Sequence, residues 1–230
     1  MSVKIRDNLW QVGGRGLTDP SDAASYLVRF GDTAALIDAG SGRGQAQLRK
    51  NIAECLEPSG QLVYLLLTHC HFDHTGGARA LRDEYGCLIV THELDAIYLR
   101  SGDNRVTGAA LYGASLEPFT IDIELQGQES KLAIGSGAVT AIHCPGHSPG
   151  SVVYTTDIDD QLILFGQDAH GPIHSEFLSD EKQYLNSLAR LLNLNADLLL
   201  EGHFGIIETK QEVREFIESC ITPTPQPCRC

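Results

Sequence analysis

The sequence contains no apolar run that approaches the length of about 18 residues needed to cross a membrane. Its first residues, Met1–Asn8, turn polar at once and lack the apolar segment of a secretory signal peptide. No pair among the seven cysteines forms a C-x-x-C motif, and an odd number does not suit a disulfide framework. These absences predict a soluble protein of the reducing cytoplasm, without a membrane partner.

Positive charge is scarce: 17 Lys and Arg stand against 30 Asp and Glu, giving a formal net charge of −13. Proteins that bind nucleic acid through its phosphates need Lys and Arg, so the composition argues against a nucleic-acid partner. It does not exclude an enzyme that cleaves phosphodiesters through bound metal. We expect a small-molecule substrate, and self-association into a homo-oligomer stays open. The nine histidines of this acidic chain need an explanation other than general positive charge.

The spacing of apolar residues predicts the strands and helices. Alternating segments at 9–12, 25–30 and 34–38, separated by Gly, Asp and Pro, predict an antiparallel meander. The continuous apolar run 62–67 predicts a strand buried on both faces. Further strands are expected at 87–90, 121–123, 131–134, 139–142, 152–154, 162–165 and 198–200, and helices at 45–57, 76–85, 92–100, 180–194 and 209–220. Two sheets with helices outside them is the simplest α/β packing for this order.

No internal repeat or long linker divides the chain, and we expect one domain over residues 1–221. The Gly-rich stretch 101–120 is weakly patterned and is predicted to be a surface insertion or lid. Residues 222–230 carry prolines at alternate positions, so they cannot form a helix and are expected to be a flexible tail with two cysteines.

Four metal-ligand side chains lie within six residues of the segment Thr68–Gly77. His69 and His71 alternate along an extended stretch, so their imidazoles face the same side. Asp73 and His74 follow as the chain turns into a helix. Imidazole and carboxylate suit zinc and related ions, and a strand-end loop keeps such a site rigid and accessible, as catalysis requires.

Three later segments place a further ligand directly after an apolar strand. His147 lies in the sequence C-P-G-H-S-P-G, Asp168 in G-Q-D and His203 in E-G-H. Strand ends gather at one edge of an α/β sandwich, so ligands that are distant in the sequence can meet there.

Taken in order, these motifs resemble the metallo-β-lactamase fold superfamily. The resemblance covers about residues 5–207 and includes the turn Asp38–Gly40 after an early strand. It implies a four-layer αββα sandwich with a dinuclear metal site at one edge. The implied first metal is held by His69, His71 and His147, the second by Asp73, His74 and His203, and Asp168 bridges the two.

The resemblance also implies a reaction. Two divalent ions, zinc in the first place with iron or manganese as alternatives, share a hydroxide that attacks the substrate, and Asp73 is the catalytic residue that orients this hydroxide. An aspartate at position 168 favours the hydrolase branch that includes glyoxalase II-like thioesterases and lactonases. We therefore expect a metallo-hydrolase that cleaves a small carbonyl substrate, a thioester or a lactone.

Two alternatives of other classes remain open at this point. The first is a phosphodiesterase or nuclease that uses the same dinuclear site. The second is a mononuclear iron dioxygenase that uses His69, His71, His147 or Asp168 and leaves the other ligands idle. The specific substrate, the native metals and the oligomeric state are not determined by the sequence.

Several other residues are candidates for a role at or near the site. His170 and His174 lie just past Asp168 and are candidates for contact with substrate, as is Tyr112 in the predicted insertion. Cys70 alternates away from its histidine neighbours, which predicts a small buried residue. His92 and His143 flank strands without a ligand pattern and are expected to be structural.

Overall fold

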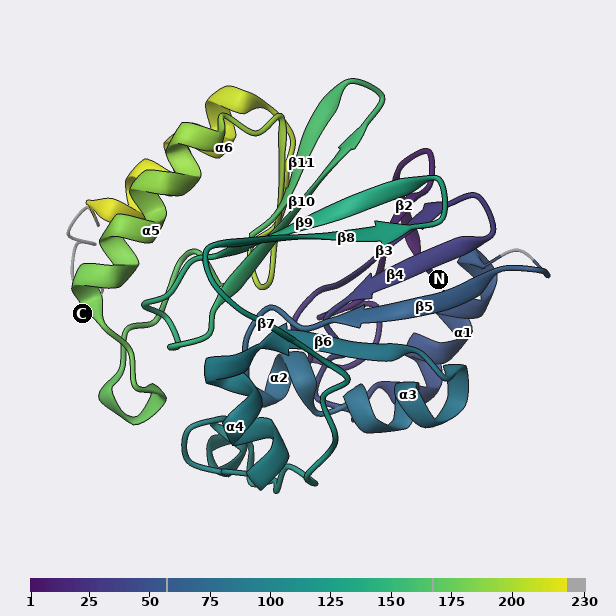
Figure 1. Ribbon diagram of the computed structural model, residues 1–230, viewed down its shortest axis with the longest axis horizontal. Helices are drawn as coiled ribbons and strands as arrows, with labels where there is room; N and C mark the ends of the chain where they lie inside the picture. The colour runs from purple at the N-terminus through teal and green to yellow at the C-terminus, as the bar shows by residue number, and fades with distance from the viewer. Residues whose placement is uncertain (57, 167, 223–230) are drawn as a thin grey trace.

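The N-terminal half of the chain forms a seven-stranded sheet in the computed structural model, which describes residues 1–56, 58–166 and 168–222 (Figure 1). The strands lie in chain order: β1 (Val3–Arg6), β2 (Leu9–Gly13), β3 (Ser25–Phe30), β4 (Thr33–Ile37), β5 (Gln61–Leu66), β6 (Leu88–His92) and β7 (Ile123–Leu125). The first four strands pair antiparallel as the predicted meander does, and β4 to β7 pair parallel. This change places the carboxyl ends of β4, β5 and β6 at one edge of the sheet.

The C-terminal half supplies a second sheet of six strands. Its order is β13 (Gly205–Ile207), β12 (Leu198–Glu201), β11 (Gln161–Phe165), β10 (Val152–Ile158), β9 (Gly137–His143) and β8 (Glu129–Ile134). All neighbours pair antiparallel except β11 and β12, which are parallel because α5 connects them.

Helices cover the outer faces of both sheets (Figure 1). On the first sheet lie α1 (Gln45–Cys55), α2 (Phe72–Thr75), α3 (Ala78–Tyr85) and α4 (Glu93–Ser101); on the second lie α5 (Glu181–Leu194) and α6 (Lys210–Ile221). Short 3-10 turns occur at Ala109–Tyr112 and Ser175–Phe177. The expected four-layer αββα sandwich is confirmed.

Three apolar clusters fill the three interfaces between these layers. Strand alternation separates them: Leu36 of β4 packs outward against the helices, whereas Ile37 packs inward between the sheets. The third cluster lies between the second sheet and the two C-terminal helices, around Leu188 and Ile217. Cys70 is fully buried in the outer cluster of the first sheet, as predicted.

Two tyrosines join the sheets across the central interface. The hydroxyl of Tyr154 on β10 donates to the carbonyl of Leu67, 2.9 Å away, at the end of β5. The hydroxyl of Tyr26 on β3 donates to the carbonyl of Glu201, 2.8 Å away, at the end of β12. Both bonds are buried and both reach the edge where the predicted ligands lie, so they fix the spacing of the two sheets there.

Some boundaries differ from the sequence expectations. Strands β1 and β13 were not predicted, because each is short and neither is fully buried. The expected helix 76–85 begins only at Ala78, and a separate turn, α2, precedes it. A Cβ on Gly76 would lie 2.3 Å from the carbonyl oxygen of Ser41, so only glycine fits at this break.

The segment 101–120 packs against the outer helices. Val106, Ala109, Leu116 and Phe119 are buried in the outer cluster of the first sheet. The expected tail falls largely on residues 223–230, which lie outside the described residues. None of the helices within the described ranges is both long enough and apolar enough to cross a membrane.

We predict that Tyr154→Phe lowers the free energy of unfolding by about 1 kcal/mol, because it leaves the buried carbonyl of Leu67 without its donor. Urea unfolding of the metal-free protein measures this. Tyr64→Phe is the matched control, since Tyr64 on β5 is only partly buried and its hydroxyl makes no hydrogen bond within the described ranges. Equal stability of the two variants would contradict the proposed link between the sheets.

Candidate metal centre

Four strand ends deliver the predicted ligands to one edge of the sandwich. His69 and His71 follow β5, His147 follows β9, Asp168 follows β11 and His203 follows β12. His71 has extended backbone angles and precedes the single turn α2, which carries the next two ligands round to a neighbouring position. The sequence expectation that distant strand ends meet is therefore met in the structure.

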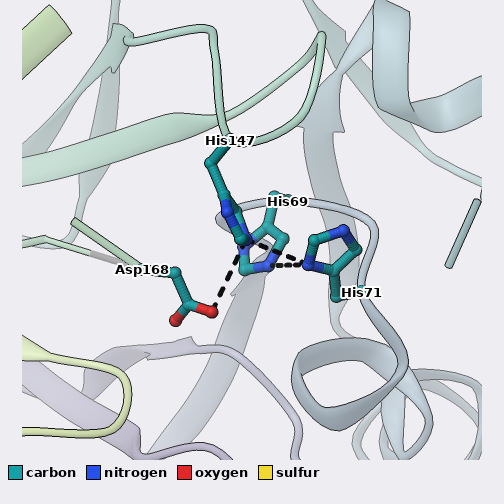
Figure 2. A group of neighbouring side chains, drawn as sticks. All are labelled: His69, His71, His147 and Asp168. Atoms are coloured by element: carbon teal, nitrogen blue, oxygen red, sulfur yellow. Dashed lines mark hydrogen bonds and ion pairs between the residues drawn. The ribbon is translucent and has the colours of Figure 1, made fainter. Parts of the chain in front are cut away.

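The first group consists of three imidazoles and a carboxylate (Figure 2). Nδ1 of His71 lies 3.0 Å from Nε2 of His69 and 3.0 Å from Nε2 of His147. Oδ2 of Asp168 lies 3.5 Å from the same atom of His147. These nitrogens converge on one point from three sides, as a metal-binding site requires.

The second group lies directly beside the first and contains Asp73, His74 and His203. Oδ2 of Asp73 lies 3.2 Å from Nε2 of His203 and 3.9 Å from Nε2 of His74. Asp168 faces this group too: its Oδ1 is 3.1 Å from Nε2 of His74, and its Oδ2 is 3.4 Å from Nε2 of His203. One carboxylate therefore contacts both groups.

Two buried atoms at the junction, Nε2 of His74 and Oδ1 of Asp168, lie 3.1 Å apart, yet neither makes a hydrogen bond of good geometry with the other or with any further described residue. Buried polar atoms are nearly always satisfied, and an imidazole nitrogen facing a carboxylate oxygen is a donor set that divalent metals bind. The residues therefore fit a divalent cation between them.

The electrostatics of the first group favour ligation. Burial, reinforced by the neighbouring His147, lowers the pKa of His71 to about 3, and burial also lowers the pKa of His69 well below its usual value. These rings are therefore neutral and their lone pairs are available, as metal binding requires.

The second group favours positive charge. Burial would lower the pKa of His203, but hydrogen bonds to Asp168 and Asp73 outweigh it and raise that pKa to about 10. Burial would raise the pKa of Asp168, yet the charge of His74 holds it well below its usual range. Either a proton or a metal ion can supply the positive charge that the carboxylates of Asp73 and Asp168 favour between them.

Asp38 orients two of the ligand rings from behind. Its Oδ2 accepts from Nδ1 of His74 at 2.7 Å and from the hydroxyl of Thr68 at 2.8 Å, and its Oδ1 accepts from the Thr68 amide. Because the Thr68 hydroxyl donates its hydrogen to Asp38, its oxygen accepts a hydrogen bond from Nδ1 of His69, 3.0 Å away. Nδ1 of His147 likewise donates to the carbonyl of Pro172 at 2.9 Å. Each of these three rings is thereby fixed with Nε2 facing the site.

Asp95 of α4 joins two ligand loops and was not predicted. Its fully buried carboxylate accepts from the amide of Cys70 at 2.8 Å, the hydroxyl of Ser148 at 2.6 Å and the amide of Gly150 at 2.6 Å. In the sequence it resembles an ordinary acidic residue in the first turn of a helix. Its role depends on the close approach of Gly150, where a Cβ would lie 2.6 Å from the Asp95 nitrogen.

Glu201 is a second buried acid that the sequence did not reveal. Its Oε2 accepts from the amides of His203 and Phe204 at 2.7 and 2.9 Å, and its Oε1 accepts from Nδ1 of His170 at 2.7 Å. Asp168, His170 and Glu201 also lie close enough to hold an ion. However, four N–H groups, including the backbone amide of His170, point at the Glu201 oxygens and oppose a cation there.

A cavity of about 280 Å³ opens onto the two groups. His170 and Tyr112 line it together with His71, Asp73, Asp168 and His203, and with apolar side chains that include Leu111 and Phe177.

His174 is exposed and is not part of this lining; its ring accepts from the amide of Glu176. His92 and His143 stack on each other away from the site, with ring centroids 3.9 Å apart.

Two packed sheets that bring five imidazoles and two carboxylates to one edge define a protein built to bind metal ions there. A family model described as "Metallo-beta-lactamase superfamily" matches residues 18–203. The chain belongs to this superfamily.

Curated relatives agree with this assignment. "Probable metallo-hydrolase MJ0888" of Methanocaldococcus jannaschii is 30% identical over 186 residues, covering 78% of this chain and 86% of that protein. "Uncharacterized protein ML0493" of Mycobacterium leprae is 33% identical over 142 residues, and the match spans 60% of this chain and 63% of that protein, less than two thirds of its length. The M. jannaschii relative is thus named as a probable metallo-hydrolase, which agrees with the superfamily that the family model shows.

Solved structures show the same fold. A metallo-β-lactamase of Cronobacter sakazakii with a HARLDQ motif superposes with a TM-score of 0.79 at 21% identity, covering 95% of this chain and 90% of that one. BJP-1, a subclass B3 metallo-β-lactamase of Bradyrhizobium japonicum, gives 0.76 at 20% identity with 95% and 90% coverage. At these identities the likeness establishes the fold and leaves the substrate open.

We predict that Asp95→Ala lowers the free energy of unfolding by about 3 kcal/mol, because three buried donors from two ligand loops lose their acceptor. Chemical denaturation of the metal-free protein measures the effect without contribution from bound ions. Glu93→Ala in the same helix removes only an exposed contact with Gln126 and should change stability by less than about 0.5 kcal/mol. A loss no greater than that of the control would show that Asp95 does not hold the loops.

Proposed function

We propose that this protein is a dinuclear metallo-hydrolase that cleaves a small carbonyl substrate, a thioester or a lactone. The observation that carries the proposal is the position of Asp168, whose two oxygens face both ligand groups within 3.5 Å. A carboxylate so placed suits a bridge between two ions.

The proposed ligands follow the two groups. His69, His71 and His147 hold the first ion, Asp73, His74 and His203 hold the second, and Asp168 serves both. Two divalent ions held by these residues would supply an activated water and neutralise the charge that develops on the substrate. Zinc is the proposed metal because imidazole and carboxylate suit it, and iron and manganese bind the same donor types.

Asp73 is the proposed catalytic residue. It lines the cavity, and one of its oxygens contacts His203. Its carboxylate is positioned to orient the attacking water and to accept the proton that the water loses. Burial, together with the charge of Asp73 and a hydrogen bond to it, raises the pKa of Tyr112, so that hydroxyl stays protonated and able to donate.

His170 and Tyr112 are the proposed substrate contacts within the cavity. Glu201 is acceptor-only, so Nδ1 of His170 carries the hydrogen and the ring orientation is fixed. The apolar side of the cavity, with Leu111 and Phe177, suits the carbon skeleton of a small substrate. Its volume of about 280 Å³ favours a small molecule over a polynucleotide.

The iron dioxygenase alternative requires the second group to stay idle. Asp73, His74 and His203 instead lie close enough together to hold an ion, although less tightly than the first group, and His74 is fully buried beside Asp168. A second group of metal-binding side chains beside the first favours two ions over one.

A hydrolysis panel on protein of measured metal content tests the proposal, with thioesters, lactones, β-lactams and phosphodiesters as substrates. We expect turnover of a thioester or lactone, and we expect Asp73→Ala and Asp168→Ala to abolish it and to hold less metal. Asp157→Ala, an exposed position on β10 with ordinary strand backbone, is the control. Preference for a phosphodiester, or wild-type turnover in either site variant, would overturn the proposal. Oxygen consumption by an iron-loaded sample would favour the dioxygenase.

Asp38→Asn should weaken metal binding by about tenfold or more, because an amide cannot accept from His74 and Thr68 as the carboxylate does. Competition with a chromogenic chelator measures the affinity. Asn tolerates the positive φ of 60° at this position, so the backbone should persist. Asp160→Asn shares that backbone angle outside the site and should bind metal like the wild type. Unchanged affinity in Asp38→Asn would show that the carboxylate does not orient the ligands.

A further inference from the structure

A second cavity, of about 490 Å³, adjoins the one that opens onto the ligand groups. The two share Tyr112 and His203, so a substrate seated at the ligands can extend from one into the other. The second cavity is formed mainly by Gln11 on β2, by the β2–β3 connection, which includes Arg15, and by Phe204 just after His203. Apart from Tyr112 and His203, none of the residues that line this cavity has a role in the proposed hydrolysis.

Arg15 is the only Lys or Arg among the residues that line either cavity. Its side chain is exposed, and within the described ranges its guanidinium makes no hydrogen bond or ion pair. In contrast, Arg43 donates to the carbonyl of Tyr112, and Arg49 pairs with Glu84. An unpaired guanidinium presents a planar set of donors that matches a carboxylate or a phosphate.

The loop that carries Arg15 is fixed by its own turn. The amides of Leu17 and Thr18 both donate to the carbonyl of Gly14, and the Gly14 amide donates to the Thr18 hydroxyl oxygen. Gly14 and Gly16 flank Arg15 with φ of 117° and 88°, angles that other residues rarely adopt. The sequence therefore builds a defined turn around this arginine.

The same loop is attached to the ligand groups. The amide of Ala23 donates to the carbonyl of Asp73 at 3.1 Å, and the amide of Ala24 donates to the carbonyl of Gly202 at 2.8 Å. Arg15 thus lies on a segment whose far end is hydrogen-bonded to two ligand-bearing loops.

Asp22, the acidic residue that lines the second cavity, is not paired with Arg15. Oδ1 of Asp22 accepts from the amide and hydroxyl of Ser41, and its Oδ2 accepts from the Thr18 hydroxyl. Both oxygens are therefore engaged within the loop, and Asp22 is buried. Phe204, with 61% of its surface exposed, provides an apolar wall in the same cavity.

We propose that Arg15 binds an anionic group of the substrate, a carboxylate or a phosphate, in the larger cavity while the scissile carbonyl lies in the smaller one. The substrate is then an acyl compound with an apolar spacer between its carbonyl and its anion. This inference rests on the proposed hydrolysis and adds a substrate class to it.

Matched thioesters test the subsite in the metal-loaded protein: S-acetyl-3-mercaptopropionate, its methyl ester, and S-acetyl-2-mercaptoethyl phosphate. We expect the wild type to prefer at least one anion over the neutral ester. Arg15→Gln should raise the KM for that anion about tenfold, with kcat little changed, because a charge-assisted contact distant from the reacting bond is lost. The neutral ester should be unaffected, and the preferred anion identifies carboxylate or phosphate.

Arg105→Gln is the matched control, since Arg105 is exposed and lies outside both cavities. It should keep the wild-type preference. Arg15→Lys retains the charge without the planar donor pair and should fall between wild type and Arg15→Gln. Equal preference in wild type and Arg15→Gln, or a wild-type preference for the neutral ester, would overturn the subsite.

Binding of non-hydrolysable analogues separates this inference from the proposed function. Thioether analogues of the same three compounds are titrated by calorimetry into wild type and Arg15→Gln. Anion binding that weakens about tenfold in the variant supports the subsite even if no thioester is hydrolysed. Failure of both anionic analogues to bind the wild type overturns it even if the neutral ester is hydrolysed.

Discussion

The carboxylate of Asp168 faces three imidazoles in a nearly buried setting, and the geometry of the whole edge depends on this contact. A charged group removed from water is costly unless a counter-charge and hydrogen bonds satisfy it. Here the two groups surround the carboxylate. The raised pKa of His203 and the lowered pKa of Asp168 show that positive charge is favoured on the side of the second group. Such an arrangement is stable only where rigid elements hold each group in place. The two sheets supply that rigidity, because every ligand follows the end of a strand or lies in the turn after one.

Three buried acids that are not proposed as ligands connect the ligand loops to one another. Asp38 ties the turn after β4 to the segment after β5, Asp95 ties that segment to the loop after β9, and Glu201 ties the end of β12 to the loop after β11. Each carboxylate accepts at least three hydrogen bonds, so its charge is compensated without a metal ion. Strand ends alone would place the ligands near one edge, and these bonds bring the side chains into mutual contact.

The sequence predicted which side chains gather at this edge better than it predicted the residues that hold them there. His69 and His71 alternate on a strand end, and that local pattern is readable without tertiary structure. Asp95 and Glu201 look like common acids of a helix start and a strand end, because their burial arises only when Gly150 and His170 approach from elsewhere. The meander and the main helices follow from apolar periodicity, whereas β1 and β13 are short edge strands defined by pairing with a neighbour. His174, close in sequence to Asp168, lies outside the cavity because the intervening chain carries it to the surface.

The proposed function rests on the side chains that gather at this edge, whereas the residues around them determine what can enter the two cavities. The superposed β-lactamases share the fold at about one-fifth identity, so the selectivity of this chain must come from its own loops. Leu111 and Phe177 shape the smaller cavity, and Arg15 lies in the larger one. With a net charge of −13 the molecule repels anions at long range, but this field is screened beyond about 8 Å at physiological ionic strength. A single unpaired guanidinium therefore acts by contact, after the substrate has arrived, and selects through the planar geometry of its donors.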